Sequence, residues 1–163
     1  NFTDWGCKRL GKDEANTWRT LSLDEWSDLT FKRNNCRELI GCAMVMDVKG
    51  LILLPDDWQC PAGVTFKPGF YPSEDKAGYG AHQNIDENEW QALEHAGAIF
   101  LPAAGYRAGL DIGNVQIDAF YWSSTANEKN KSYYMFFSAG GAEMRTRERY
   151  HAHSVRLVRD VNK

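Results

Sequence analysis

The chain has 163 residues, of which 43% are hydrophobic and 13% aromatic, and this is enough for one domain with a single core. No apolar run approaches the ~20 residues that a bilayer-spanning helix needs. The net charge of −3 is uneven: residues 126–163 hold eight basic and four acidic side chains, a net +4, whereas residues 1–125 hold 11 and 18, a net −7. A protein that binds duplex DNA is usually basic over its whole domain, so we expect no nucleic-acid partner.

The chain opens with NFTDWGC, without an initiator Met or a signal peptide. We therefore expect a mature product from which an export signal has been removed. We expect residues 1–163 to form a single domain in which 1–17 are an N-terminal extension. The cysteines lack CxxC spacing, which argues against a zinc knuckle and leaves both disulfides and free thiols open. They are Cys7, Cys36, Cys42 and Cys60.

The first predicted helix covers residues 20–33, TLSLDEWSDLTFKR. Ser22 can cap its N-terminus, and Glu25 three residues later completes a capping box. The helical period places Trp26 on the buried face.

A second helix is predicted over residues 86–97, DENEWQALEHAG. Asp86 is the expected cap and Glu89 its reciprocal partner. Trp90 lies on the buried stripe, and Gly97 is typical of a helix end.

Two short apolar runs predict buried strands, LILLP at 51–55 and AIFLP at 98–102. Between the first run and the second helix lies a long stretch rich in Gly, Pro and charge, which is typical of a functional or mobile loop. After the second run the chain enters a glycine-punctuated turn. Two helices followed by several short strands indicate an α+β fold.

Aromatic strands follow at FYWSST, residues 120–125, and SYYMFFS, residues 132–138. The small residues at 139–141 predict a hairpin in which 132–138 pairs antiparallel with 142–149. Alternate side chains on a strand point to opposite faces. Because arginines are rarely buried without partners, we expect the face with Met144 to be the core face and the face with the arginines to be exposed.

The expected core face of the hairpin also carries Met135 and Phe137, while Tyr134 and Phe136 lie beside arginine on the exposed face. Exposed aromatic rings next to arginine are typical of a recognition surface. Ordinary cross-strand pairs on a solvated sheet would give the same pattern.

The final predicted strand is SVRLVRD, residues 154–160. Val155 and Leu157 share one of its faces, and we expect them to point into the core.

Metal binding and catalysis have little support in the sequence. His151 and His153 are two residues apart, so on a strand they point the same way, as metal-binding histidines can. No third ligand is placed by the sequence, and surface histidine pairs are commoner than sites, so we expect no metal and no other cofactor. No GxSxG, Walker, HExxH or GxGxxG motif occurs, so we do not expect an enzyme.

Five motifs occur in order along the chain: WRTLSLDEW, GLILLPDDW, FLPAAGYR, YWSST and SVRLVRD. In this order they resemble the Fibrobacter succinogenes major paralogous (FISUMP-type) domain family, which is common in exported proteins of gut Bacteroidetes. The resemblance runs from Trp18 to Asp160. It implies a C-type lectin-like fold, with two helices flanking a small, mostly antiparallel sheet and with the termini near each other.

Some relatives with these motifs are variable proteins of diversity-generating retroelements, in which exposed codons of the C-terminal region are rewritten. Carried onto this chain, the resemblance implies a variable, ligand-binding region at 122–156. The chain departs from two related groups. It lacks the EPN, QPD and WND motifs of calcium-dependent sugar-binding lectins, and no cysteine follows Cys60, whereas formylglycine-generating enzymes need reactive cysteines in this region.

We therefore expect an exported or surface-displayed binding domain that recognises a protein or glycan through its C-terminal hairpin surface. Any membrane attachment would be made by an anchor outside this chain. One alternative is a structural or tip module of a cell-surface appendage, and a less favoured one is an enzyme related to formylglycine-generating enzymes. The expected ligand-binding residues are Tyr134, Phe136, Glu143, Arg145, Arg147, Arg149, Tyr150, His151 and His153.

Overall fold

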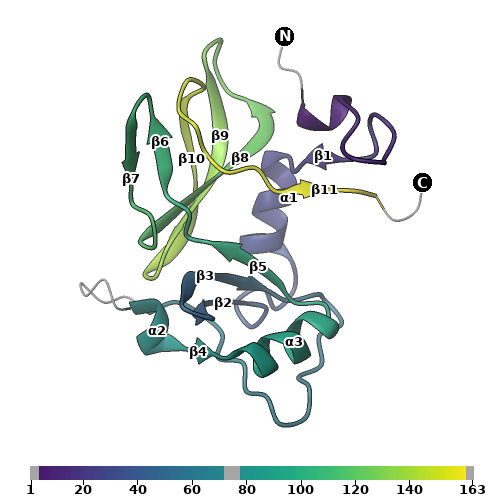
Figure 1. The fold of residues 1–163 in the computed structure, drawn as a ribbon, viewed down its shortest axis with the longest axis vertical. Coiled ribbons are helices and arrows are strands. Elements are labelled where there is room, and N and C mark those ends of the chain that lie inside the picture. Colours follow the sequence, from purple (N-terminus) through teal and green to yellow (C-terminus); the bar gives the residue numbers. More distant parts are fainter. Residues whose placement is uncertain (1–3, 72–77, 161–163) are drawn as a thin grey trace.

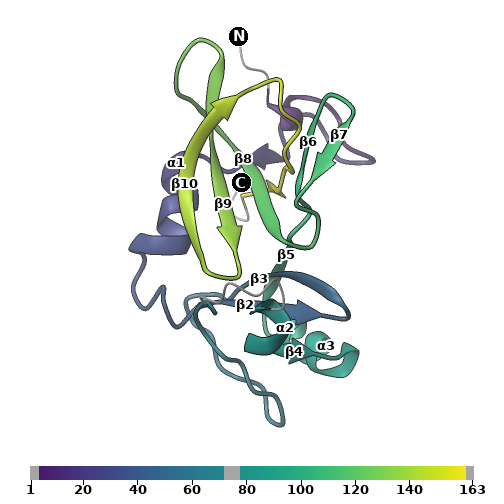
Figure 2. The same ribbon diagram turned by 90° about the vertical axis from the view of Figure 1, so that its left-hand side faces the viewer.

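The computed structural model describes residues 4–71 and 78–160, and Figures 1 and 2 show its ribbon. Its architecture is α+β, as the order of elements predicts. The helical segments are η1 (Trp5–Cys7, a 3-10 turn), α1 (Leu23–Ser27), η2 (Asp28–Lys32, a π-helical turn), α2 (Gly78–His82) and α3 (Glu87–His95). Within these described residues, no helix is long and apolar enough to cross a membrane.

The strands form small sheets in which neighbours run antiparallel, except for the parallel pair β2 and β4. A four-stranded sheet has the order β4 (Asn84–Ile85), β2 (Ile40–Val45), β3 (Val48–Leu53), β5 (Ile99–Pro102). A three-stranded sheet has the order β10 (Gly141–Glu148), β9 (Lys131–Ser138), β8 (Asp118–Ala126). Two further pairs are β1 (Arg19–Thr20) with β11 (Leu157–Val158), and β6 (Tyr106–Ala108) with β7 (Asp111–Gly113).

The four-stranded sheet is buried on both faces. Alternation along β3 directs Ile52 to one face and Leu51 with Leu53 to the other. On the Ile52 face lies α3, whose Trp90 and Leu93 pack into a hydrophobic cluster with it. The helix covers this face at the lower end of the molecule (Figure 1). The predicted strand at 51–55 is confirmed only over residues 51–53, because β3 begins earlier, at Val48, and ends at Leu53.

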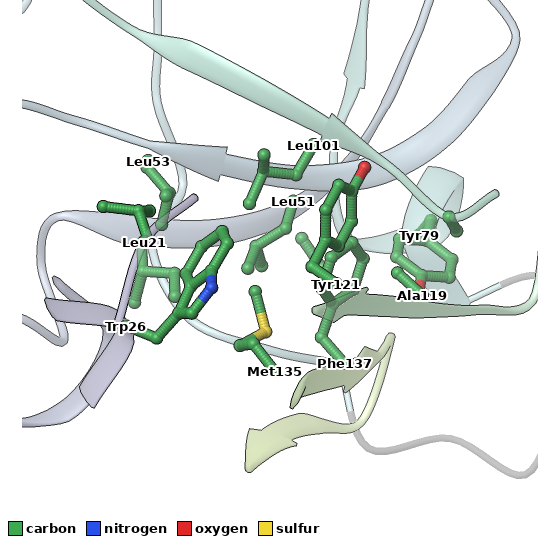
Figure 3. Close-up of a cluster of buried hydrophobic side chains, with 13 residues drawn as sticks. Leu21, Trp26, Leu51, Leu53, Tyr79, Leu101, Ala119, Tyr121, Met135 and Phe137 are labelled. Atoms are coloured by element: carbon green, nitrogen blue, oxygen red, sulfur yellow. The ribbon is translucent and has the colours of Figure 1, made fainter. Parts of the chain in front are cut away.

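The opposite face of this sheet meets the three-stranded sheet, and the main core lies between them (Figure 3). Met135 and Phe137 of β9 are fully buried there. Met144 lies directly across from Met135 on β10 and packs against the same cluster. The predicted antiparallel hairpin and its core face are thus confirmed.

Helix α1 begins at the predicted capping box. The Oγ of Ser22 accepts from the Glu25 N–H at 3.2 Å, and the Glu25 carboxylate accepts from the Ser22 N–H at 2.8 Å. The α-helical turn is short and continues as the π-helical η2, in which the Arg33 N–H reaches back five residues to the Asp28 carbonyl at 3.0 Å. Trp26 is fully buried, as the period predicts.

Helix α3 has the second predicted capping box. Its cap, Asp86, accepts from the Glu89 N–H at 2.9 Å, and Glu89 accepts from the Asp86 N–H at 3.0 Å. The chain leaves the helix through Gly97, whose φ of 92° is the left-handed conformation that glycine adopts most readily.

Replacing Asp86 with alanine is expected to lower the free energy of unfolding by about 1 kcal/mol, because the first turn of α3 loses its side-chain acceptor. Asp86→Asn keeps an acceptor and should cost only a fraction of that. Urea denaturation of both variants measures the difference. Equal stabilities for the two variants would contradict a capping role.

The closing strand differs from the prediction. Only Leu157 and Val158 form strand β11, and Val158 packs against the main core. Val155 and Leu157 are half-buried instead of inward-facing core residues, so the prediction for them is wrong. These two side chains stay half-buried for a physical reason. Strand β11 pairs with the short β1 at the edge of the molecule, and the chain before β11 crosses the outer face of the three-stranded sheet.

The glycine-punctuated turn expected after residue 102 contains a second hairpin, β6–β7. Gly109, with φ 62°, lies between its strands. The long segment between β3 and α3 contains β4 and α2, and part of it, 72–77, lies outside the described residues, so the expectation of a functional or mobile loop there is not tested. All four cysteines are free thiols, and burial raises the pKa of the Cys42 thiol.

Candidate ligand-binding surface

The outer face of the three-stranded sheet, opposite the main core, is covered by a second layer. Its first component is the β6–β7 hairpin and its second is the C-terminal segment, residues 149–156 (Figure 2). The two components are joined, because Arg107 and Ala152 exchange backbone hydrogen bonds at 2.9 and 2.8 Å. The segment is also attached to the sheet, since the Trp122 N–H donates to the Ser154 carbonyl at 2.9 Å.

Between the sheet and this layer lies a set of rings that we call the outer aromatic cluster. Successive ring centroids in it are 4.2–5.8 Å apart, a spacing typical of favourable aromatic contacts. The members come from four separate stretches of the chain. They are Tyr106, Phe120, Trp122, Tyr134, Phe136 and His153.

His153 is enclosed by this cluster. Its ring stacks on Trp122 at 4.2 Å and 21° and meets Tyr134 edge to face at 4.7 Å. Its Nδ1 is buried without a hydrogen-bond partner. Burial, together with the nearby His151 and Arg147, lowers the pKa of His153 to about 3. The imidazole is therefore neutral at physiological pH and behaves as part of the aromatic layer.

The arginines of β10 lie along the edge of this cluster. The Arg145 guanidinium carbon is 3.8 Å from the centroid of the Phe136 ring, and that of Arg147 is 5.9 Å from the centroid of Tyr106. Both distances are within the range of cation–π attraction. Arg145 also forms an ion pair with Glu143. The rings therefore favour positions close to them for two cations at the surface.

Arg149 is fixed in another way, since its Nε donates to the Lys131 carbonyl at 3.1 Å. Its neighbour Tyr150 is 76% exposed and stacks on His151 with ring centroids 4.5 Å apart. The tyrosine thus presents one broad apolar face to solvent while its other face is supported.

The structure corrects the expected exposure of part of this surface. Glu143, Arg145 and Tyr150 are exposed, and Phe136, Arg147, Arg149 and His153 are half-buried. Tyr134 and His151 are only 2% and 8% exposed, so the prediction that they face outward is wrong. Tyr134 does lie opposite Arg145 as predicted, but the C-terminal segment folds back over it.

Sequence reasoning missed the β6–β7 hairpin as part of this surface. Leu110 and Ile112 at its end are 91% and 68% exposed, and Tyr106 supports Arg147. The sequence does contain a pattern that predicts this hairpin. The segments YRA and DIG flank the two-residue loop Gly109–Leu110, and glycine at the first loop position is typical of a tight hairpin.

A cavity of about 320 Å³ opens beside the outer aromatic cluster. It lies where the C-terminal segment passes over β8, β9 and β1. The residues that line it are Thr20, Trp122, Ser123, Ser132, Arg149, His151, Ala152, His153 and Val155.

Metal ligation has no geometric support in the part of the chain that the structure describes. There, no three His, Cys, Asp or Glu side chains come close enough together to hold an ion. The Nδ1 of His151 lies 3.3 Å from the Glu148 carbonyl, and its ring centroid is 6.2 Å from that of His153.

Comparisons with curated proteins and with solved structures gave no match. A family model described as a domain of unknown function, DUF8237, matches residues 71–158. This span is more than half of the chain. It contains the three-stranded sheet, the β6–β7 hairpin and the C-terminal segment, and thus nearly all of the surface described above. On this match, the chain belongs to the DUF8237 family of domains of unknown function.

Proposed function

We propose that the chain is a binding domain with a C-type lectin-like fold, exported or displayed at the cell surface, and that it recognises a protein or glycan through the surface of its β9–β10 hairpin. The five FISUMP-type motifs support the fold and the location. The mostly antiparallel sheets and the pairing of β1 with β11 are compatible with that fold.

The observation that carries the proposal is the support of surface arginines by aromatic rings. Arg145 lies over Phe136 and Arg147 over Tyr106. Long side chains lose conformational entropy when they are immobilised by a partner. An arginine already held on a ring loses less, and its planar fork of donors suits carboxylate and carbonyl groups. Tyr150 adds an exposed aromatic anchor, a residue type enriched at energetically important interface positions.

The scaffold suits a surface whose composition varies. On β9 and β10, Met135, Phe137 and Met144 pack in or against the main core, and Phe136 and Arg145, which lie between them, face the other side. Side chains such as Glu143 and Arg145 can therefore change while Met144 and Met135 keep their packing. This supports the further proposal that 122–156 is diversified by a retroelement. A neighbouring reverse-transcriptase gene, with a near-repeat of this region differing at adenines, is the genomic observation expected.

The binding proposal is tested by probing arrays of extracellular proteins and glycans with the labelled domain. We expect saturable hits that the double variant Arg147→Ala, Tyr150→Ala loses by at least about tenfold, because anchor residues commonly contribute more than 1 kcal/mol each. The melting temperature should change little, since neither side chain belongs to the main core.

The matched control is Arg37→Ala, Phe31→Ala, which removes an arginine and an exposed aromatic ring elsewhere on the molecule. Binding should survive in this control. If the control loses the hits equally, or if the Arg147/Tyr150 variant unfolds, these side chains are structural and the surface proposal fails.

One observation favours the alternative of a structural module in a surface appendage. Leu110, Ile112 and Val115 lie close together along the chain and are 91%, 68% and 50% exposed, and exposed apolar side chains that gather on a surface mark interaction sites. A fixed partner that buries this hairpin would be recovered at constant stoichiometry from native membranes. A soluble ligand would instead be recovered only when it is supplied.

A further inference from the structure

The two edges of the three-stranded sheet differ in what lies beside them. Strand β8 forms one edge, and its outward backbone groups are occupied. The Trp122 N–H donates to the Ser154 carbonyl at 2.9 Å, and the Phe120 carbonyl accepts from the Ser154 N–H at 2.8 Å. Strand β10 forms the other edge, and among the described strands it pairs with β9 alone. The C-terminal segment therefore closes one edge of the sheet and leaves the other open (Figure 2).

The bond that continues the β9–β10 ladder shows which backbone groups of β10 point outward. The Arg149 N–H donates to the Asn130 carbonyl at 3.0 Å, so by alternation the odd-numbered residues of β10 direct their N–H and C=O groups to β9. The even-numbered residues Ala142, Met144 and Thr146 direct theirs away from it. Within the part of the chain that the structure describes, these outward N–H and C=O groups have no hydrogen-bond partner.

The side chains of β10 give this edge two different faces. Glu143, Arg145 and Arg147 alternate on the outer face, while Met144 packs against the main core on the other. Arg145 is paired with Glu143. Arg147 is half-buried and contacts the Tyr106 ring, but it forms no hydrogen bond or ion pair with any residue in the described ranges. An acidic side chain on a neighbouring strand would supply the partner that Arg147 lacks.

Charged side chains on an edge strand can also serve only to prevent pairing. The geometry of β10 favours pairing, because edges that are protected from it are usually very short, bulged or covered. Strand β10 has eight residues, and its register with β9 runs without a bulge from Gly141 to Glu148. Arginines on such an edge repel a basic strand and attract an acidic one.

We propose that β10 binds an extended acidic segment of a protein partner, which adds to the open edge of the sheet as a further strand. The outward groups of Ala142, Met144 and Thr146 bond to its backbone, and its acidic side chains face Arg145 and Arg147. Its intervening apolar side chains lie beside Met144. The inference rests on the proposed function, because it names the class of ligand for the same hairpin. The regular spacing of the backbone groups suits a peptide chain better than a glycan.

A short blocked peptide that alternates valine with glutamate is the probe, and its control carries lysine in place of glutamate. By fluorescence anisotropy of labelled peptides, we expect the glutamate peptide to bind about tenfold or more tightly, since unlike charges across a strand pair attract and like charges repel. Methylation of its backbone nitrogens should abolish binding, because it removes the donors of the added strand and leaves the charges unchanged.

Hydrogen exchange of the β10 amides tests the position of the peptide without any substitution. The Met144 and Thr146 amides point outward, so their exchange should slow when the peptide binds. The Arg145 amide already points to β9 and should keep its exchange rate. A peptide that lies across the outer face of the sheet, without pairing to the edge, would leave all three rates unchanged.

Thr146→Pro removes one outward N–H, and proline is tolerated on an edge strand where its nitrogen faces solvent. We expect this variant to fold and to bind the glutamate peptide at least about tenfold more weakly. The matched control, Thr146→Val, keeps the N–H and should bind normally. Arg147→Gln should reduce the preference for glutamate over lysine, whereas Arg107→Gln on β6 should not. Melting temperatures show whether each variant is folded.

The proposal is overturned if the glutamate peptide binds no more tightly than the lysine peptide, if the methylated peptide binds equally well, or if the Met144 and Thr146 amides exchange as fast in the complex as in the free chain. A native dimer that Thr146→Pro dissociates would also overturn it, because a second copy would then occupy the edge. The array experiment separates this inference from the proposed function. Hits that the Arg147→Ala, Tyr150→Ala variant loses, without any binding of the glutamate peptide, would end this inference alone.

Discussion

Replacing Trp26 with alanine is expected to lower the free energy of unfolding by about 3–5 kcal/mol, the range observed for buried Trp or Phe truncations. Trp26 is fully buried in the main core, where its ring lies 6.0 Å from that of Tyr121. Its Nε1 also donates to the Trp122 carbonyl at 3.3 Å. The substitution therefore removes packing between α1 and the three-stranded sheet and leaves a cavity at their contact.

Trp26→Phe separates the two contributions. It keeps most of the apolar volume and loses the indole donor, so we expect a smaller cost of about 1–3 kcal/mol for the unpaired carbonyl and the remaining cavity. Urea or guanidinium denaturation measures both variants, with the denaturant slope checked for two-state behaviour. A loss below about 1 kcal/mol for alanine would mean that α1 is not held by this residue.

Stability is expected to fall as the pH drops below neutral, and His153 is expected to be a main cause. The pKa of the folded-state imidazole is lowered from 6.5 to about 3, mainly by burial. Between these values the unfolded chain binds a proton that the folded chain excludes. Acid therefore favours unfolding, with a slope that approaches ~1.4 kcal/mol per pH unit for this one group. The loss begins near pH 6.5 and is complete near pH 3.

His153→Phe is expected to flatten this profile, because it removes the titrating group and keeps a ring in the outer aromatic cluster. At pH 7 the variant should be as stable as the native chain or more stable by about 1 kcal/mol, since it also removes a buried nitrogen that lacks a partner. Equilibrium unfolding at several pH values between 7 and 4 measures the difference between the two chains.

His151→Phe is the comparison for this experiment. His151 lies next to His153 in the same layer, and its Nδ1 is near a backbone carbonyl. Its replacement should leave most of the acid dependence in place. Identical pH profiles for the native chain and His153→Phe would contradict this prediction. They would show that the His153 imidazole binds a proton as readily in the folded chain as in the unfolded chain.

Elements governed by short-range signals were predictable from the sequence. The capping boxes at Ser22 and Asp86 need only residues three apart, and both form. The β9–β10 hairpin follows from alternation and a small-residue turn, so the burial of Met135 and Phe137 could be inferred without any tertiary information.

The outer layer was not predictable in the same way. Alternation separates two faces of a strand, but it does not reveal whether the second face meets water or another segment. Tyr134 is buried because His153 and the rest of the C-terminal segment fold back over it. The C-terminal segment is held there by the backbone bonds between Arg107 of β6 and Ala152, which are 45 residues apart in sequence. The cavity beside Arg149 results from the same long-range contact and could not be located from residue types.

The pairing of β1 with β11 has a consequence for how the domain responds to mechanical load. Arg19 lies opposite Val158, and Thr20 opposite Leu157, so the first pair is the one nearest to both outgoing chain segments. A force that separates residue 4 from residue 160 therefore opens this pair like a zipper, one bond after another, instead of shearing both together. The ion pairs of Arg19 with Glu25 and Asp160, at 2.6 and 2.9 Å, lie at this point and resist the first step. Pulling residues 4 and 160 apart would thus separate β1 from β11 first, before the force disrupts the three-stranded sheet, which carries the arginines and the aromatic rings.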